Sequence, residues 1–346
     1  TPKTGVSRRK FLIGAGVLGA SLGLGSGTLF STRKAGLAHA AGSGDTDFLF
    51  IGAGHNSLSC AMLLAKAGHK VLILEGASEI GGCAKTKEVT LPGFKHDLYA
   101  ANIGLFMGSA TFNDFGKDLF KEGFKPVVSD APMASVFPDN TGMAIYKDAD
   151  KTYNSFKEVS QHDADAWLDL LSYFKKTSPH FLPFFQVQMP SFAAFRMGFS
   201  AVRKLGVKGS YELAQMLMKS PREYTRYWFD HPKTRALFTP WAMHLDYGPD
   251  VSGGAAFPFV EPPIYFNYGM PLSQGGVGNL IKSMANIVKK HGGAIETGQK
   301  VDHILIKNGR AVGVQTADGR KIHAQKAVIA NVNPHALVDQ LIDPAQ

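Results

Sequence analysis

The order of apolar runs and glycines that begins at residue 46 predicts a series of secondary-structure elements. Thr46–Ile51 is a short apolar run of the β type, and a glycine turn at 52–54 follows it directly. A helical pattern then extends to about Ala67, and residues 70–74 predict a second strand that ends in Glu75. A strand, a tight turn, a helix and a second strand form a βαβ unit, which favours a parallel sheet.

A second patterned region lies near the other end of the chain. The glycine-rich segment 271–280 predicts a turn that opens a helix over 279–291. Runs of the β type follow at 294–297, 300–306, 311–315, 321–324 and 327–330. Asn-Gly at 308–309 and Asp-Gly at 318–319 are typical hairpin turns, so residues 300–324 predict a three-stranded meander. Residues 327–330 predict a strand that returns to the sheet.

The middle of the chain, residues 111–260, has a different pattern. It shows helical periodicity at 163–174 and 211–219 between proline-rich breaks. A cluster of aromatic residues and methionines with interleaved or following cations lies between these helices: Phe181, Phe184, Phe185, Met189, Phe192, Phe195, Arg196, Met197, Phe199, Arg203, Lys204 and Lys208. An aromatic stretch of this kind is more often core than ligand cavity. An apolar segment fringed by cations is also consistent with a substrate channel or with contact at a membrane surface, and these interpretations stay open.

The first 40 residues read as a leader. Ser-Arg-Arg-Lys-Phe-Leu at 7–12 precedes a Gly/Ala-rich apolar run at 13–30, and Ala38-His39-Ala40 closes the segment. A charged start, an apolar middle and an A-x-A end predict a secretory signal, and the adjacent arginines indicate the twin-arginine export machinery. An uncleaved membrane anchor is the alternative, although six glycines in the apolar run make it a poor spanning helix.

The leader explains most of the net charge. The whole chain carries +9, but residues 1–40 contain six cations and no acid, and the remaining 31 basic residues face 28 acidic ones. This balance gives no reason to expect nucleic-acid binding. The two cysteines, Cys60 and Cys83, form no C-x-x-C pair and no metal-ligand spacing, so we expect neither a disulfide framework nor a metal site.

The βαβ unit carries the chemistry of dinucleotide binding. Gly52 permits the tight turn, and Gly54 lets the backbone approach a pyrophosphate. The helix that begins near Asn56 offers free N–H groups to the phosphates. Ser57 replaces the third glycine of the fingerprint and is small enough for helix–strand packing. Glu75 is placed to accept hydrogen bonds from ribose hydroxyls.

The glycine pair Gly81-Gly82, just beyond Glu75, marks the FAD version of this unit. The stretch 51–86 (IGAGHNSLSCAMLLAKAGHKVLILEGASEIGGCAKT) resembles the phytoene desaturase-like branch of FAD-dependent oxidoreductases, and within it the pyridine nucleotide-disulfide oxidoreductase domain 2 subgroup. The resemblance covers residues 46–110 and about 268–335 and is loose between them. It implies that the backbone at Val301 contacts the adenine end of FAD and that Asn331 sits where the chain turns toward the cofactor.

These observations predict an α/β fold: a Rossmann-like FAD-binding domain of the glutathione reductase type with an inserted, largely helical substrate domain. The expected division is a signal peptide at 1–40, the first part of the FAD-binding domain at 41–110, the insert at 111–265 and the second part at 266–346. Members of the resembling family continue well past this point, so we expect the sequence to end before the family's C-terminal part. Either the sequence is a piece of a longer protein or the protein lacks that part, and both interpretations stay open.

The resemblance implies an FAD-dependent oxidoreductase, and the leader predicts that it is exported and is periplasmic or membrane-associated on the outer side of the cytoplasmic membrane. It would move a hydride between flavin N5 and an apolar, isoprenoid or lipid-like substrate. Because no sizeable NAD(P)H pool is expected after export, oxygen, a quinone or a protein carrier would reoxidise it. Two alternatives remain: an amine or amino-acid oxidase on the same fold, and a non-catalytic FAD-binding module that works with a partner chain.

Catalytic residues cannot be named from the sequence. Five histidines are candidates for acid–base work: His96, His162, His180, His231 and His244. None has a partner at a recognisable spacing, so a structural or surface role is expected for each.

Overall fold

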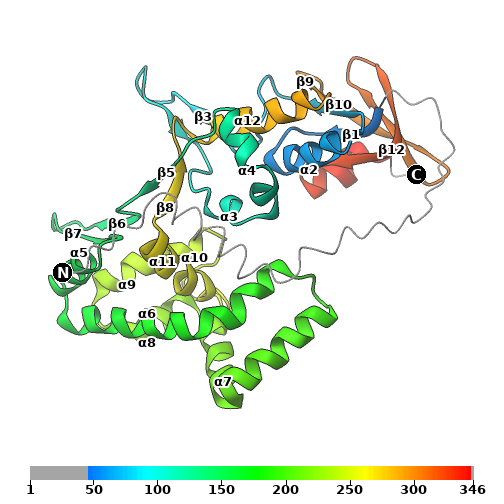
Figure 1. Ribbon diagram of the computed structural model, residues 1–346. Helices are drawn as coiled ribbons and strands as arrows, with labels where there is room; N and C mark the ends of the chain where they lie inside the picture. The colour runs from blue at the N-terminus through cyan, green and yellow to red at the C-terminus, as the bar shows by residue number, and fades with distance from the viewer. Residues whose placement is uncertain (1–45, 344–346) are drawn as a thin grey trace. The chain divides into compact units, whose positions relative to one another are not determined.

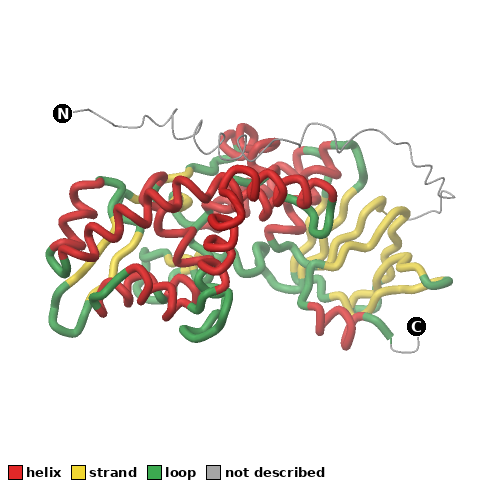
Figure 2. The backbone as a smooth tube through the Cα atoms, turned by 90° about the horizontal axis from the view of Figure 1, so that it is seen from below, coloured by secondary structure: helices red, strands yellow, loops and turns green. Residues whose placement is uncertain are grey.

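The computed structural model describes residues 46–343, and the predicted signal peptide lies outside them. The chain forms two compact units (Figures 1 and 2). One unit is Val128–Met270, and the other combines the described residues before it with those after it. The chain passes from one unit to the other within β5 (Pro126–Ser129) and within β8 (Met270–Ser273). The first unit is therefore an insertion in the second.

The discontinuous unit is built on a six-stranded sheet in the order β10-β11-β12-β1-β2-β9. Strands β12, β1, β2 and β9 are parallel, whereas β10, β11 and β12 pair antiparallel. The bounds are β1 (Thr46–Ile51), β2 (Val71–Glu75), β9 (Ala294–Thr297), β10 (Val301–Lys307), β11 (Arg310–Thr316) and β12 (Lys321–Ala330). The parallel sheet, its crossover helices and the inserted unit confirm the predicted α/β fold class.

One strand differs from the prediction. Residues 321–324 and 327–330, expected as two strands, form the single ten-residue strand β12. Its first part pairs antiparallel with β11, as Val314 opposite Ile322 shows, and its last part pairs parallel with β1, with Ala330 opposite Ile51. A register shift on the β1 side separates these regions. The meander and the parallel sheet are therefore one continuous sheet.

The apolar runs form strands because the sheet is covered. Leu49, Phe50 and Ile73 are fully buried, which fits strands of a parallel sheet with little polar alternation. Helix α2 (His55–Lys66) packs against α12 (Val277–Lys290). In α12 the buried residues Leu280, Met284 and Val288 recur every four positions and make one apolar face.

The N-terminus of α12 is closed by side chains far away in the sequence. Asp97 Oδ1 accepts a hydrogen bond from the Val277 amide (2.8 Å), and Thr86 Oγ1 accepts one from the Gly278 amide (2.8 Å). Thr86 also donates to Asp97. Gly276 has φ +94°, and a Cβ there would lie 2.7 Å from Asp97 Oδ1. The carboxylate therefore caps a positive helix end and fixes the second glycine-rich turn.

The remaining helices and strands of this unit are β3 (Thr86–Lys87), β4 (His96–Asp97), α3 (Gly104–Met107), α4 (Ala110–Lys121) and the π-helical turn η2 (Ala336–Leu341). Cys60 and Cys83 are free thiols.

The unit Val128–Met270 is mostly helical. Besides β6 (Met133–Val136) and β7 (Gly142–Ile145), it contains α5 (Ala149–Lys157), α6 (Gln161–Phe181), η1 (Leu182–Gln186), α7 (Phe192–Met218), α8 (Pro221–Trp228), α9 (Pro232–Phe238), α10 (Pro240–Met243) and α11 (Ala256–Tyr268). Its core is aromatic: Phe156 stacks on Trp167, and Phe229 packs on Phe238 with ring centroids 4.6 Å apart. The helix expected at 211–219 is the second half of α7, which bends at Gly206.

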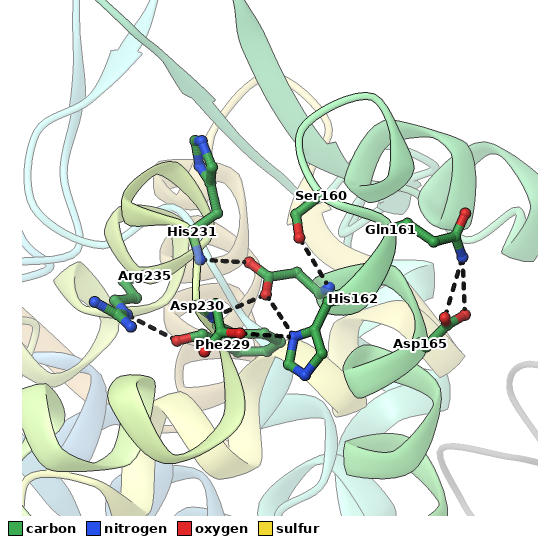
Figure 3. A network of polar contacts seen from close by, with 9 residues as sticks. Ser160, Gln161, His162, Asp165, Phe229, Asp230, His231 and Arg235 are labelled. Atoms are coloured by element: carbon green, nitrogen blue, oxygen red, sulfur yellow. Dashed lines mark hydrogen bonds and ion pairs between the residues drawn. The ribbon is translucent and has the colours of Figure 1, made fainter.

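A buried carboxylate fixes the loop between α8 and α9 to the start of α6 (Figure 3). Asp163 is fully buried, and its two oxygens accept hydrogen bonds from the amides of Asp230 (2.8 Å) and His231 (3.0 Å). Burial raises the pKa of Asp163, but the hydrogen bonds that it accepts outweigh burial, so its pKa lies below the ordinary value. The buried negative charge is therefore satisfied by the backbone.

Among residues 46–343, no helix is both long enough and apolar enough to cross a membrane.

We predict that Asp163→Asn lowers the free energy of unfolding by about 2–4 kcal/mol, because a carboxamide leaves one buried amide without an acceptor. The Asp163 contribution is present above its ordinary pKa and is lost as the pH falls through the lower folded value. The difference between variant and parent should therefore shrink in acid, as urea unfolding at several pH values would show. Asp165→Asn, at an exposed position of the same helix, is the control; an equal loss there would contradict the prediction.

Candidate functional site

The turn between β1 and α2 brings three backbone segments together. Gly52 has φ +93°, and a Cβ on it would lie 2.9 Å from the carbonyl oxygen of Asn331. The Asn331 amide donates to the Ile51 carbonyl (3.0 Å), so the residue after β12 is held beside the end of β1. Only glycine fits position 52, because both its conformation and its neighbour exclude a side chain.

The N-terminus of α2 is open. Gly54 is its N-cap residue, no side chain of the described part of the chain caps it, and its first turn carries no acidic residue. Asn56 is exposed in that turn. The free N–H groups and the positive end of the helix dipole suit a bound anion. This end differs from that of α12, where Asp97 already occupies the equivalent place.

Ser57, the substitute for the third glycine, is 2% exposed. Its small side chain packs in the first turn of α2, as expected. Its hydroxyl is buried and has no hydrogen-bond partner within the described chain. The fingerprint position is thus filled by a residue that leaves one polar atom available.

Glu75 links the turn to the end of β2. One of its oxygens accepts from the Ala53 amide (2.7 Å) and the other accepts from the Ala77 amide (2.9 Å). Each carboxylate oxygen has two lone pairs, so the group can still accept from a ribose hydroxyl. Glu75 therefore orders the glycine turn as well as offering the acceptor that the sequence predicts.

The glycine pair 81–82 lies against this turn. Gly81 forms a parallel bridge with Gly54, and its amide donates to the Ala53 carbonyl (2.9 Å). A Cβ on Gly82 would lie 3.4 Å from the Gly54 Cα. The two glycine signals, 27 residues apart in the sequence, therefore belong to one site.

Val301 begins β10 at the other side of Glu75. The Gln299 amide donates to the Glu75 carbonyl (2.8 Å), and Lys300 lies beside Gly76. Val301 itself is buried in a cluster with Leu74. The backbone at Val301, which is predicted to contact adenine, therefore lies close to Glu75, which is predicted to bind the ribose.

The structure fits a dinucleotide flavin at this place. It gathers Gly52, Gly54, Ser57, Glu75, Gly81, Gly82, Val301 and Asn331 around one turn and leaves Asn56 at its exposed edge. Close backbone approach and an uncapped helix end are features that a bound pyrophosphate would use. The role of each residue toward the cofactor remains a prediction.

The inserted unit contains an apolar cavity of about 400 Å³. It is lined by residues of α6, η1 and α7: His180, Phe181, Phe184, Phe185, Gly198, Ala201, Val202, Leu205, Ser210, Leu213, Ala214 and Leu217. The Ser210 hydroxyl is buried and has no hydrogen-bond partner among the described residues. The volume lies within the range of small-molecule sites. This cavity suits an apolar ligand with a polar group at one end.

The aromatic cluster of the sequence divides between core and surface. Phe181 is buried, Phe184 and Phe185 line the cavity, and Phe192, Phe195 and Phe199 are more than 60% exposed. Core packing therefore explains only the first part of the cluster.

The histidines have structural or surface positions, apart from His180 at the cavity. His231 Nδ1 accepts from the Lys233 amide (3.2 Å) and caps α9. His96 contacts Thr90 (2.7 Å), and His162 lies exposed beside Asp163 and Asp230. His244 is exposed. No group of three His, Cys, Asp or Glu side chains in the described part of the chain could hold a metal ion.

The sequence reasoning missed Glu261. It is the only charged residue of the apolar helix α11, and that isolation was the signal that could have found it. Its Oε2 atom is buried and has no hydrogen-bond partner within residues 46–343. Burial raises the pKa of Glu261 to about 7. A carboxyl group that titrates near neutrality can hold or release a proton, which makes it a candidate for acid–base work.

Comparison with known proteins supports a flavin cofactor. Residues 58–346 match the family model described as "Flavin containing amine oxidoreductase". The chain is similar to one of the subunits of the limonene dehydrogenase of Castellaniella defragrans, with 26% identity over 83% of this chain and 52% of the relative. It is also similar to the neurosporene-forming phytoene desaturase of Rhodobacter capsulatus, with 23% identity over 82% of this chain and 52% of the relative.

Among solved structures, the fatty acid isomerase of P. acnes shares the fold, with a TM-score of 0.53 at 15% identity over 88% of this chain and 63% of that one. The chain spans about half the length of the curated relatives that it matches. The family match and the desaturase relative confirm the predicted resemblance and the predicted flavin cofactor.

Glu75→Gln should weaken FAD binding roughly 10- to 100-fold, because the amide group of Gln opposes a backbone N–H and loosens the glycine turn. Titration of the apoprotein with FAD, followed by flavin fluorescence, would measure this. Glu79→Gln is the matched control, because Glu79 lies on the same loop and forms an exposed ion pair with Lys87 (3.2 Å). Equal affinities for the two variants would show that Glu75 has no part in the site.

Glu261→Gln should stabilise the protein at alkaline pH. The raised pKa means that the folded chain keeps a proton that the unfolded chain releases between pH 4.5 and about 7, so stability from this group falls over that interval. After discounting for partial exposure, the gain at pH 8 should be on the order of 1–2 kcal/mol and should vanish near pH 4. Denaturant unfolding at both pH values tests this, with the exposed Glu158→Gln as control; a pH-independent difference would contradict it.

Proposed function

The chain belongs to the flavin-containing amine oxidoreductase family, and we propose that it is the FAD-binding part of an oxidoreductase that moves a hydride between flavin and an apolar, isoprenoid or lipid-like substrate. The observation that carries this proposal is the gathering of both glycine signals, Glu75 and Asn331 around the open end of α2. FAD bound there would supply a hydride acceptor or donor at N5.

The residues of the chain would bind and orient the cofactor. The free amides of the α2 N-terminus would bind the pyrophosphate, and Glu75, which holds Ala53 in place, would accept hydrogen bonds from the ribose. Val301 and Asn331 border the same turn. None of these groups needs to change its protonation state, so their work is positioning.

Two observations support an apolar substrate. The relatives include a protein of limonene dehydrogenase and a phytoene desaturase, whose named substrates are terpenoid hydrocarbons. The cavity between η1, α6 and α7 is lined almost entirely by apolar side chains. The cavity lining also contains no acidic residue that could pair with the cation of an amine substrate.

The leader extends the proposal to location and partners. A twin-arginine signal at residues 1–40 would export the protein after it has folded around its cofactor. Outside the cytoplasm, oxygen, a quinone or a protein carrier would then take the electrons. Because the limonene dehydrogenase relative is one of several subunits by its name, a partner chain is part of this proposal.

The test is anaerobic reduction of the purified flavoprotein. We expect the flavin absorbance to persist through purification and to bleach with isoprenoid hydrocarbons or alcohols but not with primary amines. Ala201→Phe, which fills the cavity, should slow bleaching at least ten-fold and leave the flavin content unchanged. The control is Ala193→Phe at an exposed position of the same helix.

Bleaching by amines with release of hydrogen peroxide would support an amine oxidase instead. A folded chain that retains no flavin would support a module that needs a partner chain.

A further inference from the structure

The first half of α7 has its large apolar side chains on the outside. Phe192 is 80% exposed, Phe195 71% and Phe199 66%. These residues are three and four positions apart, so they lie on one face of the helix. In Figure 1, α7 projects at the lower edge of its unit. Exposed aromatic side chains that cluster in this way mark an interaction surface.

Much of the inward side of the same helix is made of small residues, although Leu205 also faces inward. Ala194 is buried, while Gly198 and Ala201 face the cavity. A helix stabilised only by its own unit would bury its phenylalanines and expose its alanines, because burying a Phe side chain contributes about 1.5–3 kcal/mol. The inverted pattern indicates that the outer face is covered by an apolar phase outside this unit.

The positive charge of residues 170–211 indicates which apolar phase covers the outer face of α7. The 42 residues between Asp169 and Glu212 contain six Lys or Arg and no acidic residue. Arg196 and Arg203 lie on or beside the aromatic face and border a hollow with Ser200. Within residues 46–343, no ion pair neutralises Arg196, Arg203 or Lys204, whereas Lys208 lies 3.9 Å from Glu212. These cations are free to bind anionic groups.

We propose that the outer face of α7, defined by Phe192, Phe195, Arg196, Phe199, Val202 and Arg203, docks on a membrane that contains anionic phospholipids. The aromatic rings would enter the boundary between headgroups and acyl chains, and the arginines would bind lipid phosphates. An interfacial helix needs an apolar face with flanking cations, which α7 has, and need not span the bilayer.

Docking in this way places the cavity at the lipid. Phe185 and Val202 line the cavity, yet they are 69% and 42% exposed, so the cavity reaches the surface beside the docking face. An apolar molecule dissolved in the bilayer would reach the cavity without crossing water. Docking itself does not depend on the flavin reaction, and its test has no catalytic readout.

The test is binding of the full chain to vesicles of phosphatidylcholine alone and of phosphatidylcholine with phosphatidylglycerol. We expect preference for the anionic vesicles, weakened by salt. Phe195→Ser with Phe199→Ser should lower the partition coefficient about ten-fold or more. Phe94→Ser, which changes a phenylalanine of 62% exposure in the other unit, should leave it unchanged. Arg203→Gln should lower it about five-fold, and Arg226→Gln in α8 much less.

Residues 1–40 are also basic and partly apolar, so binding of the full chain to vesicles does not show which segment contacts the lipid. A fluorescent probe on α7 itself is therefore needed. In Phe199→Trp, the added fluorescence should be quenched by brominated lipids, and in Phe94→Trp it should not. Quenching at neither position, or equal losses in the docking-face and control variants, would overturn the proposal. A dimer in sedimentation that Phe195→Ser dissociates would also overturn it and assign the face to a second copy of the chain.

Discussion

The close approach of three backbone segments at the end of β1 is the constraint on which the site depends. Asn331 leaves no room for a side chain at Gly52, and Gly81 bridges to Gly54 while Gly82 lies beside its Cα. Glu75 holds the intervening residue from the third side. The uncapped N-terminus of α2 therefore lies beside the backbone of Gly81, Gly82 and Asn331. A substitution at Gly52 would push Asn331 away, because a Cβ there would lie 2.9 Å from the Asn331 carbonyl oxygen, and would lose the geometry that a pyrophosphate requires.

Two other carboxylates, those of Asp97 and Asp163, also accept hydrogen bonds from backbone amides. Asp97 caps α12 from a hairpin 180 residues away, and Asp163 joins the start of α6 to a loop 67 residues away. In each case a negative charge meets N–H groups that would otherwise be unpaired, which makes the contact both specific and costly to remove. Glu75 also accepts a hydrogen bond from a backbone amide, but that amide belongs to Ala53, which precedes α2. Asp97 therefore closes the N-terminus of α12, whereas Glu75 leaves the N-terminus of α2 open to an anionic ligand.

The inserted unit combines two features with one physical basis. Its cavity is apolar because Phe, Leu, Val and Ala side chains of α6, η1 and α7 line it, and the outer surface of α7 is apolar because phenylalanines of that helix face outward. Both features suit a molecule that is poorly soluble in water. The family and the site geometry support the flavin part of the function, while the substrate class rests on the cavity and on relatives that are about twice as long as the matched region.

The sequence by itself determined the βαβ unit, the glycine turn, Glu75, the meander and the returning strand, because turn chemistry and short periodicities are encoded within windows of a few residues. It also predicted which residues would bind the cofactor, although not how they meet. Only the tertiary structure joined residues 321–330 into one strand, brought Gly81 and Asn331 against Gly54, and showed Asp97 as a helix cap.

Tertiary structure also decided burial. Phe181 and Phe195 are alike in the sequence, yet one is core and the other is surface, because the direction in which a helix presents a residue depends on what packs against it. For the same reason the raised pKa of Glu261 was hidden: a carboxylate in an apolar helix titrates normally unless its neighbours remove it from water.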